Sequence, residues 1–185
     1  MMDESLFQTE LQPGEHIEWT GRPDYRHIFS TIDILLIPFS ILWGGFAIFW
    51  EISTIVIHAP VLFSLGGMPF VIVGLYLIVG RFFYRRWEKQ HTWYAVTNQR
   101  IMILTTTFGH KTQSIFLKTL PRIDKSITSN GSGTLIFGTS MPFGLGGNSG
   151  WIMGNTGRYV PPAFYDISSV QHVYDLINRL RQTTS

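Results

Sequence analysis

The sequence contains no cysteine among its 185 residues. This absence excludes disulfide bonds, thiolate metal sites, iron–sulfur clusters and cysteine nucleophiles. Charged residues are also scarce, at 14% against about 25% in a typical soluble domain. Hydrophobic residues make up 45% of the chain, which is too apolar for disorder. Part of the chain is therefore expected to lie in lipid.

Two stretches carry most of the hydrophobicity, from Ile28 to about Trp50 and from about Ala59 to Val79. Each has about 20 residues, the length that a helix needs to cross the hydrocarbon core of a bilayer. We expect two transmembrane helices, at about 28–50 and 59–79, within a hairpin over residues 28–80. Asp33, the one charge inside them, is either an interfacial carboxylate that reaches water or a functional carboxylate within the membrane.

The basic residues that flank these stretches predict their orientation. Arg22 and Arg26 precede the first stretch, and the connecting segment from Glu51 to His58 contains no lysine or arginine. Four basic residues follow the second stretch: Arg81, Arg85, Arg86 and Lys89. Because lysine and arginine concentrate on the cytoplasmic side, we expect a multi-pass protein with both termini in the cytoplasm.

The remainder of the chain has the pattern of short strands followed by a helix. Alternation and turn residues predict strands over about 93–97, 100–107, 111–117, 122–129 and 134–138, arranged as an antiparallel meander. The N-terminal segment, residues 1–27, contributes a further strand at Glu15–Trp19 that joins residues 81–185 in one domain. An apolar stripe predicts a C-terminal amphipathic helix that packs on the strands: Val170, Val173, Tyr174, Ile177 and Leu180.

Several motifs, taken in order, resemble the membrane-anchored bacterial pleckstrin-homology-like (PH-like) domain family. They are Pro13-Gly14-Glu15 with Trp19-x-Gly21-Arg22-Pro23, Tyr94-x-Val96-Thr97-Asn98-x-Arg100, Gly133-Thr134-Leu135-x-Phe137 and Phe164-x-x-Ile167. The resemblance covers most of the chain and implies a bent sandwich or partly open barrel capped by the C-terminal helix. It implies no catalytic residue, and it places the protein in the bacterial inner membrane. The segment from Thr139 to Pro162 departs from the family by being longer and richer in glycine.

The sequence offers little support for catalysis. No two histidines are spaced as a metal-ligand pair, and no nucleophile elbow or phosphate-binding loop occurs. We expect no catalytic residue, cofactor or metal site, and no nucleic-acid partner, because no basic run interleaved with aromatics stands out.

Two regions are candidate contact sites. Arg81, Arg85, Arg86 and Lys89 either only set the topology or also contact anionic lipid headgroups. From Thr92 onward eight lysines and arginines face three aspartates, which favours an anionic neighbour. The segment 139–162 either packs over the sandwich or recognises a bilayer or protein partner, and its candidate recognition residues are Phe143, Leu145, Trp151 and Arg158.

Two functions fit these observations. The first is a non-enzymatic membrane protein that presents a PH-like domain at the cytoplasmic face to bind a protein partner or acidic lipid. The second is a structural or assembly subunit of a membrane complex, with the transmembrane helices as the interface. Membrane lipids and a protein partner or a second copy of the chain are the expected partners.

Overall fold

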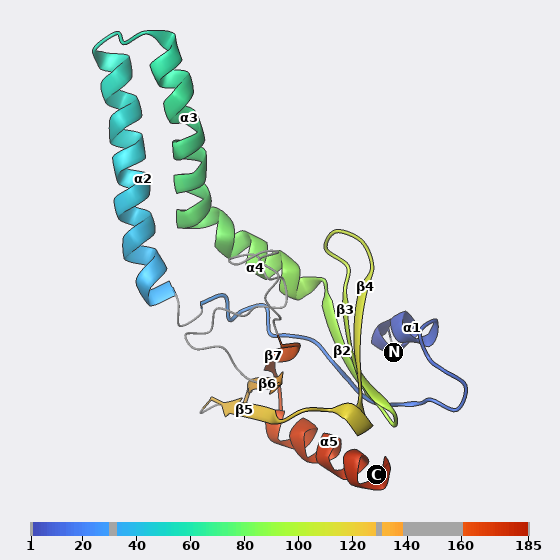
Figure 1. Cartoon of the computed structure of the whole chain (residues 1–185). Helices are drawn as coiled ribbons and strands as arrows, with labels where there is room; N and C mark the ends of the chain where they lie inside the picture. The colour runs from blue at the N-terminus through green and yellow to red at the C-terminus, as the bar shows by residue number, and fades with distance from the viewer. Residues whose placement is uncertain (1, 30–32, 129–130, 139–160, 185) are drawn as a thin grey trace. The chain divides into compact units, whose positions relative to one another are not determined.

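The computed structural model describes residues 2–29, 33–128, 131–138 and 161–184, and the chain divides into two units (Figure 1). The sheet unit combines Met1–His27 with Trp87–Ser185, and the helical unit is Ile28–Arg86. The sequence analysis places the second division at 80/81, six residues earlier. Helix α4 runs from Arg81 to Gln90, so the boundary between Arg86 and Trp87 lies inside this helix and not at its start.

The helical unit contains the two apolar stretches as long helices, which confirms that part of the predicted fold. Helix α2 spans Asp33–Val56, and α3 spans Val61–Leu75. A π-helix, η1 (Tyr76–Gly80), joins α3 to α4, so that helical structure runs unbroken over Val61–Gln90. Both runs are long and apolar enough to cross a membrane.

Helix α2 extends beyond the predicted end of its apolar stretch. Glu51–Val56 belongs to the helix rather than to the connecting segment, which shrinks to residues 57–60. One carboxylate among apolar residues does not stop a helix, whereas His58 adopts a positive φ of 53° and Pro60 cannot donate a helical hydrogen bond. The helix therefore ends at these local signals and not where hydropathy falls.

Helices α2 and α3 approach closely at one pair of glycines. A Cβ atom on Gly74 would lie 2.8 Å from the Cα of Gly44, a distance that requires the backbones to separate. Small residues allow this kind of contact between helices in lipid, where packing rather than the hydrophobic effect drives association.

The sheet unit contains two antiparallel sheets instead of one continuous meander. The first has the order β1-β2-β3-β4 and the second the order β5-β6-β7, and the described residues do not close them into a barrel. The strands are β1 (Ile17–Gly21), β2 (Thr92–Thr97), β3 (Arg100–Thr105), β4 (Lys111–Phe116), β5 (Ile123–Ile127), β6 (Gly133–Phe137) and β7 (Ala163–Ile167). A 3-10 helix, η2 (Leu117–Thr119), and Pro121 interrupt the chain between the sheets.

The main core lies between the two sheets and the C-terminal helix α5, Val170–Thr184. The predicted apolar stripe of this helix supplies Val170, Val173 and Ile177, which are fully buried. The ring of Phe164 on β7 stacks on Tyr94 at 4.5 Å between centroids. Strand β7 was not among the predicted strands, although it supplies the centre of this core.

The first sheet is also covered on its other face. Ala95, Met102 and Leu104 form a second cluster with Phe7, which lies on the N-terminal helix α1 (Met2–Gln8). Strands β2 and β3 are therefore buried on both faces, which explains why they read as nearly continuous apolar runs.

A buried ion pair joins the N-terminal segment to the first sheet. Arg100 donates from Nε to Glu15 Oε1 at 2.9 Å and from Nη2 to Glu15 Oε2 at 3.0 Å. The Thr97 hydroxyl donates to Glu15 Oε1 at 2.7 Å. Burial alone would raise the pKa of Glu15, but bonds from Arg100, the Gln12 amide and Thr97 outweigh it and lower that pKa.

Removing the carboxylate charge should destabilise the sheet unit. Glu15→Gln leaves Arg100 buried without its counter-ion, and breaking such a pair costs about 3–5 kcal/mol. Glu18→Gln, which removes the partly exposed partner of His16, serves as the control and should cost about 0–1 kcal/mol. Thermal and denaturant unfolding of the full chain in detergent measures both.

The same variants give a pH test. The folded pKa of Glu15 is lowered, so its stabilisation is complete above the unfolded value of about 4.3 and is lost as pH falls through the folded pKa. The melting temperatures of wild type and Glu15→Gln should therefore converge at acidic pH. A constant difference between pH 7 and pH 3 would contradict this assignment.

Candidate functional site

The helical unit carries a charged cluster at one end. Asp33, the first residue of α2, accepts a hydrogen bond from Arg85 Nη1 at 2.5 Å, and its other oxygen lies 3.5 Å from Arg81 Nη2. The Asp33 side chain is 3% exposed and that of Arg81 is 6% exposed. Arg85 also donates to the carbonyl of Ile28 at 3.2 Å. A carboxylate suits the positive end of the α2 dipole, which adds to its stabilisation.

The π-helix before α4 sets the face on which the two arginines lie. The Arg81 amide donates to the carbonyl of Tyr76, five residues earlier, whereas in a regular α-helix it would donate to the fourth residue back. This wider turn adds a residue to the helix and rotates the chain that follows relative to a regular α-helix. Arg81 and Arg85 then lie four residues apart on one face of α4 and reach the same carboxylate.

The cluster has more positive charge than its one carboxylate neutralises. Within the described chain, Nε, Nη1 and Nη2 of Arg81 make no hydrogen bond, although all three are buried. A guanidinium stays protonated at any physiological pH, so the cluster is suited to binding an anion and not to transferring a proton. Placing unbonded donors in the interior is costly, which marks Arg81 as the candidate functional residue of this unit.

The sequence analysis named these residues without pairing them. Asp33 is expected there as either an interfacial or a functional intramembrane carboxylate, and Arg81 and Arg85 as residues that either only set the topology or also contact anionic headgroups. The structure brings the three together in a buried ion-pair cluster. Their spacing of 52 positions between Asp33 and Arg85 gives no local signal, so the pairing could not be read from the sequence. Contact of the arginines with lipid stays a prediction.

Lys89 belongs to a separate arrangement in the sheet unit. Its ammonium group donates to Asp166 Oδ2 at 2.5 Å, to the carbonyl of Asp24 at 3.5 Å and to the carbonyl of His27. The Asp24 amide in turn donates to the carbonyl of Asp166 at 2.9 Å. Lys89 therefore ties the segment before the hairpin to β7. Arg86, the fourth predicted contact, is exposed.

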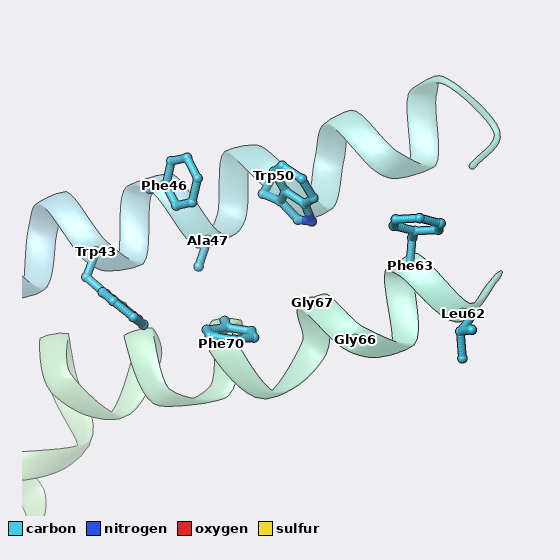
Figure 2. Close-up of a pocket in the computed structure, with 9 residues that line it drawn as sticks. All are labelled: Trp43, Phe46, Ala47, Trp50, Leu62, Phe63, Gly66, Gly67 and Phe70. Carbon is cyan, nitrogen blue, oxygen red and sulfur yellow. The ribbon is translucent and has the colours of Figure 1, made fainter. Parts of the chain in front are cut away.

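An apolar cavity of about 500 Å³ lies between α2 and α3 (Figure 2). Figure 2 shows Trp43 and Ala47 of α2 directed toward α3, and Phe63 and Phe70 of α3 directed toward α2. Its lining consists of Trp43, Phe46, Ala47, Trp50, Leu62, Phe63, Gly66, Gly67 and Phe70. Such a surface accommodates an apolar side chain or hydrocarbon and offers no group for acid–base or nucleophilic chemistry.

The remaining predicted site residues lie outside the described part of the chain. They are Phe143, Leu145, Trp151 and Arg158. In the described ranges no group of three histidine, aspartate or glutamate side chains could hold a metal ion. The expectation that the protein has no catalytic or metal site stays a prediction.

Comparisons with protein-family models, with curated proteins and with solved structures return no match to this chain. The resemblance to the PH-like family therefore stays a prediction.

The three charged residues of this cluster should stabilise the helical unit jointly, so that the costs of removing them are not additive. Asp33→Asn leaves two buried guanidinium groups without a counter-ion and should cost about 3–5 kcal/mol in detergent unfolding of the full chain. Adding Arg85→Gln to this variant should cost less than the sum of the single changes, because the partners are in direct contact.

Glu51→Gln provides the matched control, since Glu51 is the other acidic residue of α2. Its Oε2 has no hydrogen-bond partner in the described chain, so neutralising it should not destabilise the unit. Equal losses for Asp33→Asn and Glu51→Gln, or strictly additive losses for Asp33 and Arg85, would contradict the ion-pair cluster.

Proposed function

We propose that this is a non-enzymatic protein of the bacterial inner membrane, in which two transmembrane helices anchor a PH-like domain at the cytoplasmic face. The domain binds a protein partner or an acidic lipid. The observation that carries this proposal is the apolar exposure of the helical unit. Only 22% and 11% of the residues in the most apolar windows of its two helices are buried, unlike the core helices of a soluble protein.

The sheet unit supports the second part of the proposal. Its two antiparallel sheets and the C-terminal helix packed on them agree in outline with the architecture that the family resemblance implies. No group of the described residues resembles a catalytic constellation, and the polar clusters are ion pairs that hold elements together.

The charge of the sheet unit favours a protein partner over a purely electrostatic lipid contact. From Thr92 onward the sequence has an excess of five basic residues, but β1 joins the acidic N-terminal segment to this region. The whole sheet unit contains eleven lysines and arginines and ten aspartates and glutamates. Its net charge is therefore close to neutral, and general attraction to an anionic surface is weak.

The second candidate function is a structural or assembly subunit of a membrane complex. The cavity between α2 and α3 favours it, because an apolar helix of a partner or a second copy could place side chains against its aromatic lining. Purification in mild detergent separates the two functions. A complex with a partner protein that has a fixed stoichiometry, and that persists when the contacts between the sheet unit and the partner are removed, supports the subunit function.

The topology prediction can be tested with single cysteines, because the chain has none of its own. Ile57→Cys lies in the connection between α2 and α3, where Ile57 is 71% exposed. It should react with a membrane-impermeant thiol reagent in intact cells, whereas Gln182→Cys near the C-terminus should react only after lysis. The reverse pattern would overturn the orientation, and labelling of both in intact cells would overturn the membrane anchor.

The recognition segment gives a second test. If Phe143 and Trp151 bind a partner, Phe143→Ser and Trp151→Ser should leave the melting temperature unchanged and abolish co-purification of the partner. If they pack on the sheet unit, the same changes should cost about 1–3 kcal/mol of stability. Loss of stability together with loss of binding would assign these residues to packing and end their role as the recognition surface.

A further inference from the structure

The turn between β3 and β4 carries the most exposed large apolar side chain in the described chain. Phe108 is 81% exposed, and the next such residues of the sheet unit are Ile127 at 49% and Phe116 at 45%. Side chains of comparable exposure otherwise lie on the two apolar helices, for example Ile34 and Leu62 at 79%. The sequence predicts only a turn at Phe108.

The sheet register explains why the turn displays this ring. Strands β3 and β4 pair as far as Thr105 and Lys111, so the five residues between them form a tip beyond the ladder. Gly109 adopts a φ of 115°, which reverses the chain after Phe108. Phe108 belongs to neither of the two core clusters of the described residues.

The tip is held against the end of α4. The Thr106 amide donates to the carbonyl of His91 at 2.9 Å. The ring of Phe108 contacts Trp87 edge-on at 5.3 Å between centroids, and Trp87 contacts His91 at the same separation. Phe108 therefore forms one aromatic cluster with the last turns of the helix.

Trp87 of this cluster lies on α4, which continues an apolar helical stretch along the chain. Helical structure is continuous from Val61 to Gln90, and its last apolar stretch ends at Gly80. Trp87 lies six residues after Arg81, a rise of about 9 Å along the helix. That distance is comparable to the thickness of a headgroup layer, where tryptophan is the preferred residue.

The charge of the turn is compatible with a lipid surface. The segment from Thr106 to Lys111 contains no acidic residue, and His110 and Lys111 are exposed. An apolar ring beside a basic side chain suits the boundary between acyl chains and phosphate groups.

We propose that the β3–β4 turn inserts Phe108 into the headgroup and upper acyl region of the leaflet that surrounds α4. This inference rests on the membrane anchoring in the proposed function and adds a second lipid contact to the sheet unit. The contact is apolar, so it does not depend on the near-neutral net charge of that unit.

The absence of cysteine permits a direct test on the full chain. His110→Cys is labelled with an environment-sensitive fluorophore, which keeps Phe108 in place, and Ile127→Cys is the control on the second sheet. The protein is reconstituted, with no other protein present, in vesicles of phosphatidylethanolamine and phosphatidylglycerol that contain lipid spin-labelled at an upper acyl carbon. The label at position 110 should be quenched at least twofold more than the label at position 127.

Adding Phe108→Ser to the His110→Cys variant identifies the anchoring side chain. The quenching should fall to the level of the Ile127→Cys control, while the melting temperature stays unchanged because Phe108 is almost fully exposed. Equal quenching at positions 110 and 127 would overturn the inference and leave Phe108 as a contact for a protein. Labelling of both Ile57→Cys and Gln182→Cys in intact cells would instead overturn the membrane anchor itself.

Discussion

The hydrogen-bonded ladder between β1 and β2 is the interaction on which the rest of the structure depends. The helical unit is inserted between these two neighbouring strands, and the bond from the His16 amide to Asn98 Oδ1 spans 82 positions of the chain. Closing so long a connection costs conformational entropy, which the ladder, the Glu15–Arg100 pair and the Phe7 cluster offset together. The two ends of the helical unit are thereby held to one sheet.

This arrangement determines where the charges of the chain lie. Glu15 is buried with Arg100, and Lys89 binds the segment that precedes the hairpin as well as Asp166. In the helical unit, Asp33 forms ion pairs with Arg81 and Arg85. Ionised groups are costly to bury unless they are paired, so each cluster defines one permitted arrangement of its elements. The basic residues near the spans consequently have a structural role in addition to any effect on topology.

The exposed apolar surface follows a different rule in each unit. On α2 and α3 it is extensive, as expected where the surroundings are lipid and not water. In the sheet unit the most exposed large apolar side chain described is Phe108, in the turn that contacts Trp87 of α4. In the proposed function, the anchor sets the position of the domain and its remaining surface recognises the partner.

The periodicity of the sequence determined the two apolar helices, strands β1 to β6 and the buried stripe of α5, because these depend on residues close together in the chain. Helix α2 ends later than the apolar stretch predicts, because the backbone conformation of His58 and the proline at position 60 determine where the helix stops. Only the tertiary structure brought Asp33 to Arg85 and Glu15 to Arg100, across 52 and 85 positions. It also separated the strands into two sheets and placed Phe108 against Trp87. Such contacts arise when whole elements pack, and no pattern within a single element encodes which distant side chain will meet it.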